Sequence, residues 1–132
     1  MKKNSLIAAF LLLAGSLSAQ SLSDVWVPDL GNGKYKNPII DADYSDPDVC
    51  RVGDDYYMTS SSFNCIPALQ ILHSKDLVNW TIIGYAAERL KPEDVFSKPQ
   101  HGNAVWAPSI RYHNGEFYVC YGEAPRAGEA TE

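Results

Sequence analysis

Short stretches of alternating apolar and polar residues, separated by turn-forming residues, occupy the middle of the chain. β-Branched and aromatic side chains recur there with the period of two that is typical of half-buried strands. A Gly-Asp-Asp turn at residues 53–55 separates the first two stretches. We expect four short antiparallel strands and no convincing helix among them, at 49–52, 56–61, 69–73 and 80–85. Residues 87–103, with two prolines, a glycine and many charges, are expected to form a loop.

The strand–turn–strand pattern returns 61 residues later, where residues 108–119 align with residues 47–58 without a gap. Asn114-Gly115, a strong hairpin signal, stands where Gly53-Asp54 stands in the first copy. A repeat of four strands fits the blade of a β-propeller better than other repeat classes. Propellers have about 4–8 blades, which a chain of 132 residues is too short to close. Either the chain is a fragment of a longer protein, which we favour, or the propeller interpretation is wrong.

The first 19 residues resemble a secretory signal peptide, with two lysines, an apolar run at 6–14 and small residues up to Ala19. The run is too short for a membrane-spanning helix, which needs about 20 residues. Cleavage after Ser18 fits the small-x-small rule better than cleavage after Ala19. We therefore expect residues 1–19 to be a signal peptide, residues 20–36 to be a lead-in segment, and the protein to be periplasmic or extracellular.

The chain is acidic, with a formal net charge of −5. Removal of the leader takes two lysines and no acid, which leaves 9 basic against 16 acidic residues, a net charge of −7. An acidic surface argues against nucleic acid or an anionic membrane as a partner. It leaves a neutral partner, such as a sugar, open.

Cysteine and histidine spacing favours no metal site. The cysteines are Cys50, Cys65 and Cys120, an odd number without a C-x-x-C pair. We expect them to be small buried apolar residues, although a disulfide that cannot be assigned stays open. The histidines, at 73, 101 and 113, form no metal-binding spacing either.

Four aspartates precede the first predicted strand, at positions 41, 43, 46 and 48. Acids crowded at the start of a strand repel one another, which invites a functional explanation. Period-two alternation would place Asp46 and Asp48 on one face, with Pro47 on the other. At the mouth of a propeller channel, the Asp46 carboxylate could act as a general base on water. The alternative is an acidic turn that caps the strand.

Calcium binding is a second possible role for these acids. An EF-hand is excluded, because Asp46 stands where the loop needs glycine and Val52 where it needs glutamate. An irregular calcium site stays open.

Two aromatic residues, Phe63 and Trp106, stand at the expected open ends of strands. Rings in such positions suit stacking on the apolar face of a sugar, whereas packing between blades is the alternative. The remaining rings on the predicted strands are expected in the core or on the sheet surface, including Trp80 in the core.

Five motifs, in this order and at this spacing, resemble the start of glycoside hydrolase family 43. They are NPII at 37–40, SDPD at 45–48, VGDDYY at 52–57, HSKDLVNW at 73–80 and VWAP at 105–108. The resemblance covers residues 37–122 and is strongest to β-xylosidases and α-L-arabinofuranosidases.

This resemblance implies an all-β, five-bladed β-propeller, of which residues 37–132 supply about the first blade and the start of the second. It implies inverting hydrolysis of terminal xylose or arabinose, with Asp46 as the general base and with Phe63 and Trp106 lining the sugar pocket. The general acid, a glutamate, and an aspartate that tunes it would lie beyond Glu132. Cys65 stands where relatives often have a further aromatic, so the leaving-group subsite is expected to differ.

The resemblance implies no required cofactor, although a structural calcium ion is possible in the full-length protein. The partner it implies is a xylo- or arabino-oligosaccharide. Two alternatives stay open: a propeller that binds carbohydrate or has a structural role without catalysis, and a truncated product that misfolds at its open blade edges.

Overall fold

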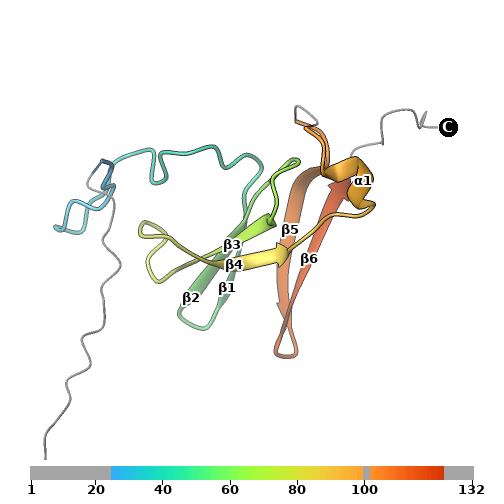
Figure 1. Cartoon of the computed structure of the whole chain (residues 1–132). Helices are drawn as coiled ribbons and strands as arrows, with labels where there is room; N and C mark the ends of the chain where they lie inside the picture. Colours follow the sequence, from blue (N-terminus) through green and yellow to red (C-terminus); the bar gives the residue numbers. More distant parts are fainter. Residues whose placement is uncertain (1–24, 100–101, 124–132) are drawn as a thin grey trace, which may run out of the picture.

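The computed structural model describes residues 25–99 and 102–123, and the regular secondary structure of this part of the chain is almost entirely β (Figure 1). Four strands form one antiparallel sheet in the order β1-β2-β3-β4, and two more form a hairpin beside it. The strands are β1 (Asp48–Val52), β2 (Asp55–Thr59), β3 (Ala68–Ser74), β4 (Thr81–Ala87), β5 (Val105–His113) and β6 (Glu116–Glu123). The predicted signal peptide at 1–19 lies outside the described residues.

The four strands predicted for the first sheet are all present, with bounds that differ by two residues at most. The expected loop at 87–103 is wrong at one place, because Glu93–Phe96 form a single helical turn, α1, after Pro92. Four residues are too few to show a helical period in the sequence. Burial of the Phe96 ring anchors this turn. No helix within the described ranges is long and apolar enough to cross a membrane.

The repeat predicted from the sequence is confirmed by the pairing of the strands. In the first hairpin the pairs run from Asp48↔Thr59 to Val52↔Asp55. In the second hairpin they run from Ser109↔Cys120 to His113↔Glu116, which is the same register shifted by 61 residues. Both turns use a left-handed glycine, Gly53 (φ 62°) and Gly115 (φ 88°). The two copies therefore share one backbone plan.

Both copies also carry a β-bulge at the start of the hairpin. In the second copy the pairing steps from Trp106↔Gly122 to Ser109↔Cys120, which leaves two residues of β5 opposite one of β6. The first copy makes the same step, because the N–H of Ser61 donates to the carbonyl of Ser45 (3.0 Å) just ahead of the regular ladder. Bulges bend a strand and redirect its side chains, often beside active sites.

The two residues inside each bulge, Asp46-Pro47 and Ala107-Pro108, form what we call the corner of each copy. Asp46 has a φ of 49° and Ala107 a φ of 41°, both in the left-handed region that residues other than glycine rarely adopt. Simple alternation, which predicted Asp46 and Asp48 on one face, therefore does not extend through the corner: β1 begins only at Asp48.

The buried core joins the first sheet to the second hairpin. It consists of residues from the start of β3, from the connection that contains α1, and from the start of β5: Ala68, Leu69, Leu90, Phe96, Ala104 and Val105. The rings of Tyr57 on β2 and Phe117 on β6 also meet, with centroids 4.6 Å apart. Apolar burial between the copies therefore holds the hairpin against the sheet.

The HSKDLVNW motif forms the loop between β3 and β4. The Asp76 carboxylate accepts hydrogen bonds from the hydroxyl of Ser74 (3.0 Å) and from the backbone N–H groups of Val78 (2.9 Å) and Asn79 (2.8 Å). Burial alone would raise the pKa of Asp76, but the hydrogen bonds from Asn79, Val78 and Ser74 outweigh it and lower the pKa to about 2. The polar residues of this motif therefore shape a loop.

Two expectations about side chains are wrong. Cys65 and Cys120 are exposed, and Cys50 is half-buried, so the cysteines are not buried core residues. All three are unpaired. Trp80 is half-buried and its ring N–H donates to the carbonyl of Leu77 (3.0 Å), so it belongs to the loop rather than to the core.

Asp48 links the first copy of the repeat to the second through hydrogen bonds. Its Oδ2 accepts hydrogen bonds from the backbone N–H of Ile110 (2.7 Å) and from Nη1 of Arg111 (2.5 Å), both on β5. Burial would raise the pKa of Asp48, but these two donors outweigh burial, so its pKa lies below the ordinary value. The ionised carboxylate is therefore the form that stabilises this contact.

We expect Asp48→Asn to lower the free energy of unfolding of the purified protein by about 1 kcal/mol at pH 7, because the charged acceptor is lost. A lowered pKa gives stability that is present above the ordinary pKa and is lost as the pH falls through the lowered one. The difference between wild type and variant should therefore shrink below about pH 4. Urea unfolding at several pH values measures it, with Glu88→Gln, an exposed acid directly after β4, as the control. An unchanged difference at pH 3 and pH 7 would contradict this role.

Candidate functional site

The Asp46 carboxylate lies at the corner of the first copy and is exposed. Its Oδ2 accepts a hydrogen bond from the hydroxyl of Ser61 (2.9 Å). Its Oδ1 has no hydrogen-bond partner within the described part of the chain. One oxygen is thus fixed while the other is open to solvent, which is the arrangement that a general base for water requires.

Ser61 connects this carboxylate to the second copy. The residue follows β2 and is 3% exposed. While its hydroxyl donates to Asp46, its Oγ accepts the backbone N–H of Ala107 (2.8 Å). The corner of the first copy and the corner of the second therefore meet at a single buried hydroxyl.

Phe63 comes two residues later and is also tied to β5. Its backbone exchanges two hydrogen bonds with Val105, at 3.0 and 3.2 Å. The residue lines a shallow hollow of about 420 Å³ together with residues 42–45, the segment that leads to Asp46. The structure thus places Phe63 beside the approach to the first corner.

Trp106 stands between Val105 and Ala107, the two residues that bind Phe63 and Ser61. Its side chain is 39% exposed, and its Nε1 donates to the carbonyl of Gly102 (2.5 Å). The three residues predicted for the site therefore lie on three segments, and the segment of Phe63 hydrogen-bonds both to the segment of Asp46 and to the segment of Trp106.

The backbone at this place is strained. Asp46, Phe63 (φ 52°) and Ala107 all adopt left-handed conformations, and Ala104 (φ 83°) does so nearby. Each such residue costs about 1–3 kcal/mol and persists only where its surroundings hold it. Such residues gather at functional sites, so their concentration here supports the choice of this corner.

The aspartates at positions 46 and 48 have different surroundings. Asp48 is held by Ile110 and Arg111 and is committed to the contact between the copies. Asp46 has a single hydrogen bond and a free oxygen. The pattern of the sequence could not separate these two roles, because both carboxylates flank the same proline.

Sequence reasoning missed Ser61 and Arg111. Ser61 was only the last residue of the strand predicted at 56–61, although a buried run of serines, Ser60-Ser61-Ser62, at the end of a strand is itself unusual. Arg111 belongs to none of the five motifs. Its contact with Asp48 links residues 63 positions apart, so no local pattern in the sequence indicates it.

No group of three or more His, Cys, Asp or Glu side chains could hold a metal ion in residues 25–99 and 102–123. Asp41 and Asp43 lie in this range, so the structure gives no support to the irregular calcium site left open above. His73 instead contacts Asp55 (2.5 Å), an interaction that Lys75 shares (2.6 Å).

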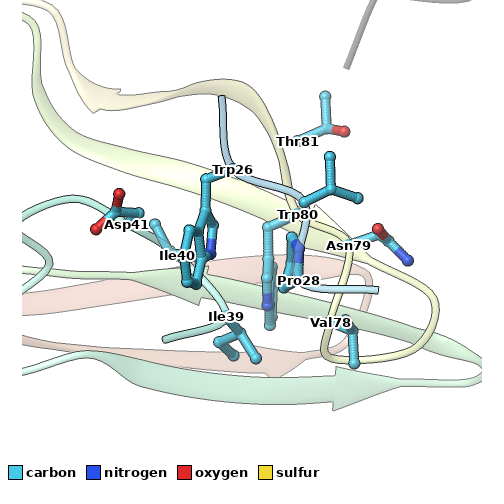
Figure 2. A pocket seen from close by; sticks show the side chains of 10 residues that line it. Trp26, Pro28, Ile39, Ile40, Asp41, Val78, Asn79, Trp80 and Thr81 are labelled. Atoms are coloured by element: carbon cyan, nitrogen blue, oxygen red, sulfur yellow. The ribbon is translucent and has the colours of Figure 1, made fainter. Parts of the chain in front are cut away.

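A second hollow, of about 300 Å³, lies where the lead-in segment meets the β3–β4 loop. Figure 2 shows the rings of Trp26 and Trp80 side by side in it, with Ile39 and Ile40 nearby. The Nε1 of Trp26 donates to the carbonyl of Pro38 (2.7 Å), so both indole N–H groups are used within the chain. The β3–β4 loop follows Ser74, which pairs near the end of β1 and β2 opposite to Asp46, so the loop side of this hollow lies away from Asp46.

Comparison with known proteins gives a consistent result. Residues 35–132 match the model of glycosyl hydrolases family 43. A non-reducing end α-L-arabinofuranosidase of Bacteroides ovatus is 40% identical over 100 residues, which are 74% of this chain and 19% of that protein. A β-xylosidase of Bacillus subtilis is 41% identical over 88 residues, which are 67% of this chain and 16% of that protein.

Solved structures agree. A family 43 protein from a Bacteroides ovatus xyloglucan PUL has a TM-score of 0.57 and 45% identity, over 70% of this chain and 18% of that one. A family 43 protein of Bacillus licheniformis has a TM-score of 0.57 and 44% identity, over 64% of this chain and 16% of that one. The chain spans less than one fifth of the length of these relatives. It belongs to glycosyl hydrolase family 43: its β1–β4 sheet is a blade of that family's five-bladed β-propeller, and its β5–β6 hairpin is the start of the next blade.

Proposed function

We propose that this chain supplies the general base and part of the sugar pocket of an exported glycoside hydrolase that removes terminal xylose or arabinose with inversion. The observation that carries the proposal is the state of Asp46: Ser61 holds one carboxylate oxygen, the other has no partner among the described residues, and the same Ser61 accepts the N–H of Ala107, next to Trp106 in the chain. The names of the relatives, α-L-arabinofuranosidase and β-xylosidase, support the substrate class.

In this reaction the free oxygen of Asp46 takes a proton from a water molecule while that water attacks the anomeric carbon. An acid on the opposite side of the sugar protonates the leaving oxygen, and the two carboxyls stand about 6.5–9.5 Å apart to admit the water. The sugar ring would stack on Trp106 and Phe63, whose apolar faces match its C–H face.

The described glutamates of the second hairpin do not complete this pair. Glu116 lies at the β5–β6 turn, where its carboxylate accepts a hydrogen bond from Tyr118 (2.9 Å). Glu123 pairs with Val105 at the site end of β6, but it stands in no motif of the family. The resemblance instead assigns the acid to a glutamate in a later blade.

We expect Asp46→Asn in the full-length protein to lower kcat on nitrophenyl xyloside and nitrophenyl arabinofuranoside by about 10²–10⁴-fold, because the amide cannot accept the proton of water. The unfolding temperature should change little, since one hydrogen bond acceptor remains. Asp54→Asn, an exposed aspartate in the β1–β2 turn, is the matched control. Near-normal turnover by the Asp46 variant would remove this residue from the mechanism and favour a propeller that only binds carbohydrate.

The 132-residue chain alone is expected to release no nitrophenol from either substrate, because it provides a base without the acid. A purified sample with measurable turnover, abolished by Glu123→Gln, would show instead that the second hairpin provides the acid.

The proposed stacking of the sugar on Trp106 is tested by a separate substitution. We expect Trp106→Ala to raise KM for the xyloside about tenfold, which corresponds to about 1.4 kcal/mol of lost stacking. Trp26→Phe, at the second hollow, should leave KM unchanged, because neither Asp46, Phe63 nor Trp106 lines that hollow. Equal effects of both substitutions would point to a general loss of stability rather than to a sugar contact.

A further inference from the structure

Among the serines that follow β2, only Ser61 touches the carboxylate of the proposed base. Ser60 accepts a hydrogen bond from the side chain of Gln70 (2.5 Å). The Oγ of Ser62 is buried and has no partner among the described residues. Ser61 alone links Asp46 to Ala107. Three adjacent buried hydroxyls thus have three different surroundings.

The hydrogen bonds at Ser61 have a fixed direction. A hydroxyl has one hydrogen to donate and lone pairs to accept with. A backbone N–H can only donate, so the contact with Ala107 occupies an Oγ lone pair and leaves the hydroxyl hydrogen for Asp46. An ionised carboxylate can only accept, so the arrangement matches Asp46 in its charged form.

The second copy shows that the fold does not need this hydrogen bond. At the equivalent positions, 61 residues later, Ala107 replaces Asp46 and Gly122 replaces Ser61. The bulge and the left-handed corner are nevertheless the same, with φ of 49° and 41°. Carboxylate and hydroxyl are therefore absent together from a corner that folds in the same way, which favours a role in chemistry over a role in folding.

We propose that Ser61 is a positioning residue for the general base: its hydroxyl holds Oδ2 of Asp46, turns Oδ1 toward the attacking water, and ties that orientation to the seating of β5. The inference rests on the proposed function. Rotation of the carboxylate about its χ angles would otherwise be free, since Oδ2 has no second donor among the described residues.

The test uses Ser61→Ala in the full-length protein, with Ser62→Ala as the matched control from the same buried run. We expect Ser61→Ala to lower kcat about 10–100-fold with KM within about twofold, because the carboxylate of the base loses the donor that orients it while the sugar contacts remain. Ser62→Ala should change none of these values. Ser61→Thr, which keeps the hydroxyl, should recover most of the wild-type kcat.

A double-mutant cycle separates positioning from folding. In the Asp46→Asn background, Ser61→Ala should lower the remaining activity by less than about twofold, because no base is left to orient. A further 10–100-fold loss in that background would overturn the proposal, as would a kcat for Ser61→Ala within twofold of wild type. Should Ser61→Ala fail to fold, the same cycle is run with Ser61→Cys, which keeps the size but donates weakly.

The two proposals fail in different ways. Normal turnover by Asp46→Asn would overturn the proposed function itself. Loss of turnover by Asp46→Asn together with normal turnover by Ser61→Ala would leave the base in place and overturn only the role of Ser61.

Discussion

The site depends on hydrogen bonds that cross from the first copy of the repeat to the second. Asp48 receives donors from Ile110 and Arg111, and Ser61 joins Asp46 to Ala107. None of these contacts lies within a single sheet. The carboxylate of the proposed base is therefore oriented only when β5 packs against β1. The apolar core that buries Val105 holds β5 in that position.

These contacts between the copies explain why the neighbouring residues Asp46 and Asp48 can have different roles. Pro47 separates two carboxylates that would repel each other if both faced the same space. The bulge sends Asp48 to donors on β5, where its charge is compensated by Arg111. Asp46 is left with one neutral donor and one free oxygen. Because Arg111 compensates the charge of Asp48, the charge of Asp46 meets less repulsion and its carboxylate stays available for the reaction.

Local signals in the sequence were sufficient for the strands and for the repeat. Alternation of apolar residues and the turn residues Gly53 and Gly115 act over a few positions, so their effect survives in any tertiary setting. The repeat was also visible because identical register demands similar residues at similar spacing. The family motifs added the identity of Asp46, which alternation alone could not single out from Asp48.

The parts that could not be predicted all depend on contacts between distant residues. α1 exists because Phe96 is buried in the core between the copies, and its four residues show no period of their own. Cys120 lies on β6 and is exposed, whereas Ile110 on the paired strand β5 is buried, because burial of a strand residue depends on what packs against its face of the sheet. The left-handed φ of Asp46 leaves no trace in the sequence, since aspartate tolerates that conformation more readily than most residues.

Repetition also indicates how such a site can arise. Each copy presents its corner at the same end of its sheet, with the same bulge and the same left-handed residue. The backbone plan is constant, so chemistry is chosen by side chains at the corner: the first copy places a carboxylate there, and the second places an indole one residue earlier, at Trp106. Because Ser61 hydrogen-bonds to both corners, a single repeated structural feature can supply different parts of the proposed site.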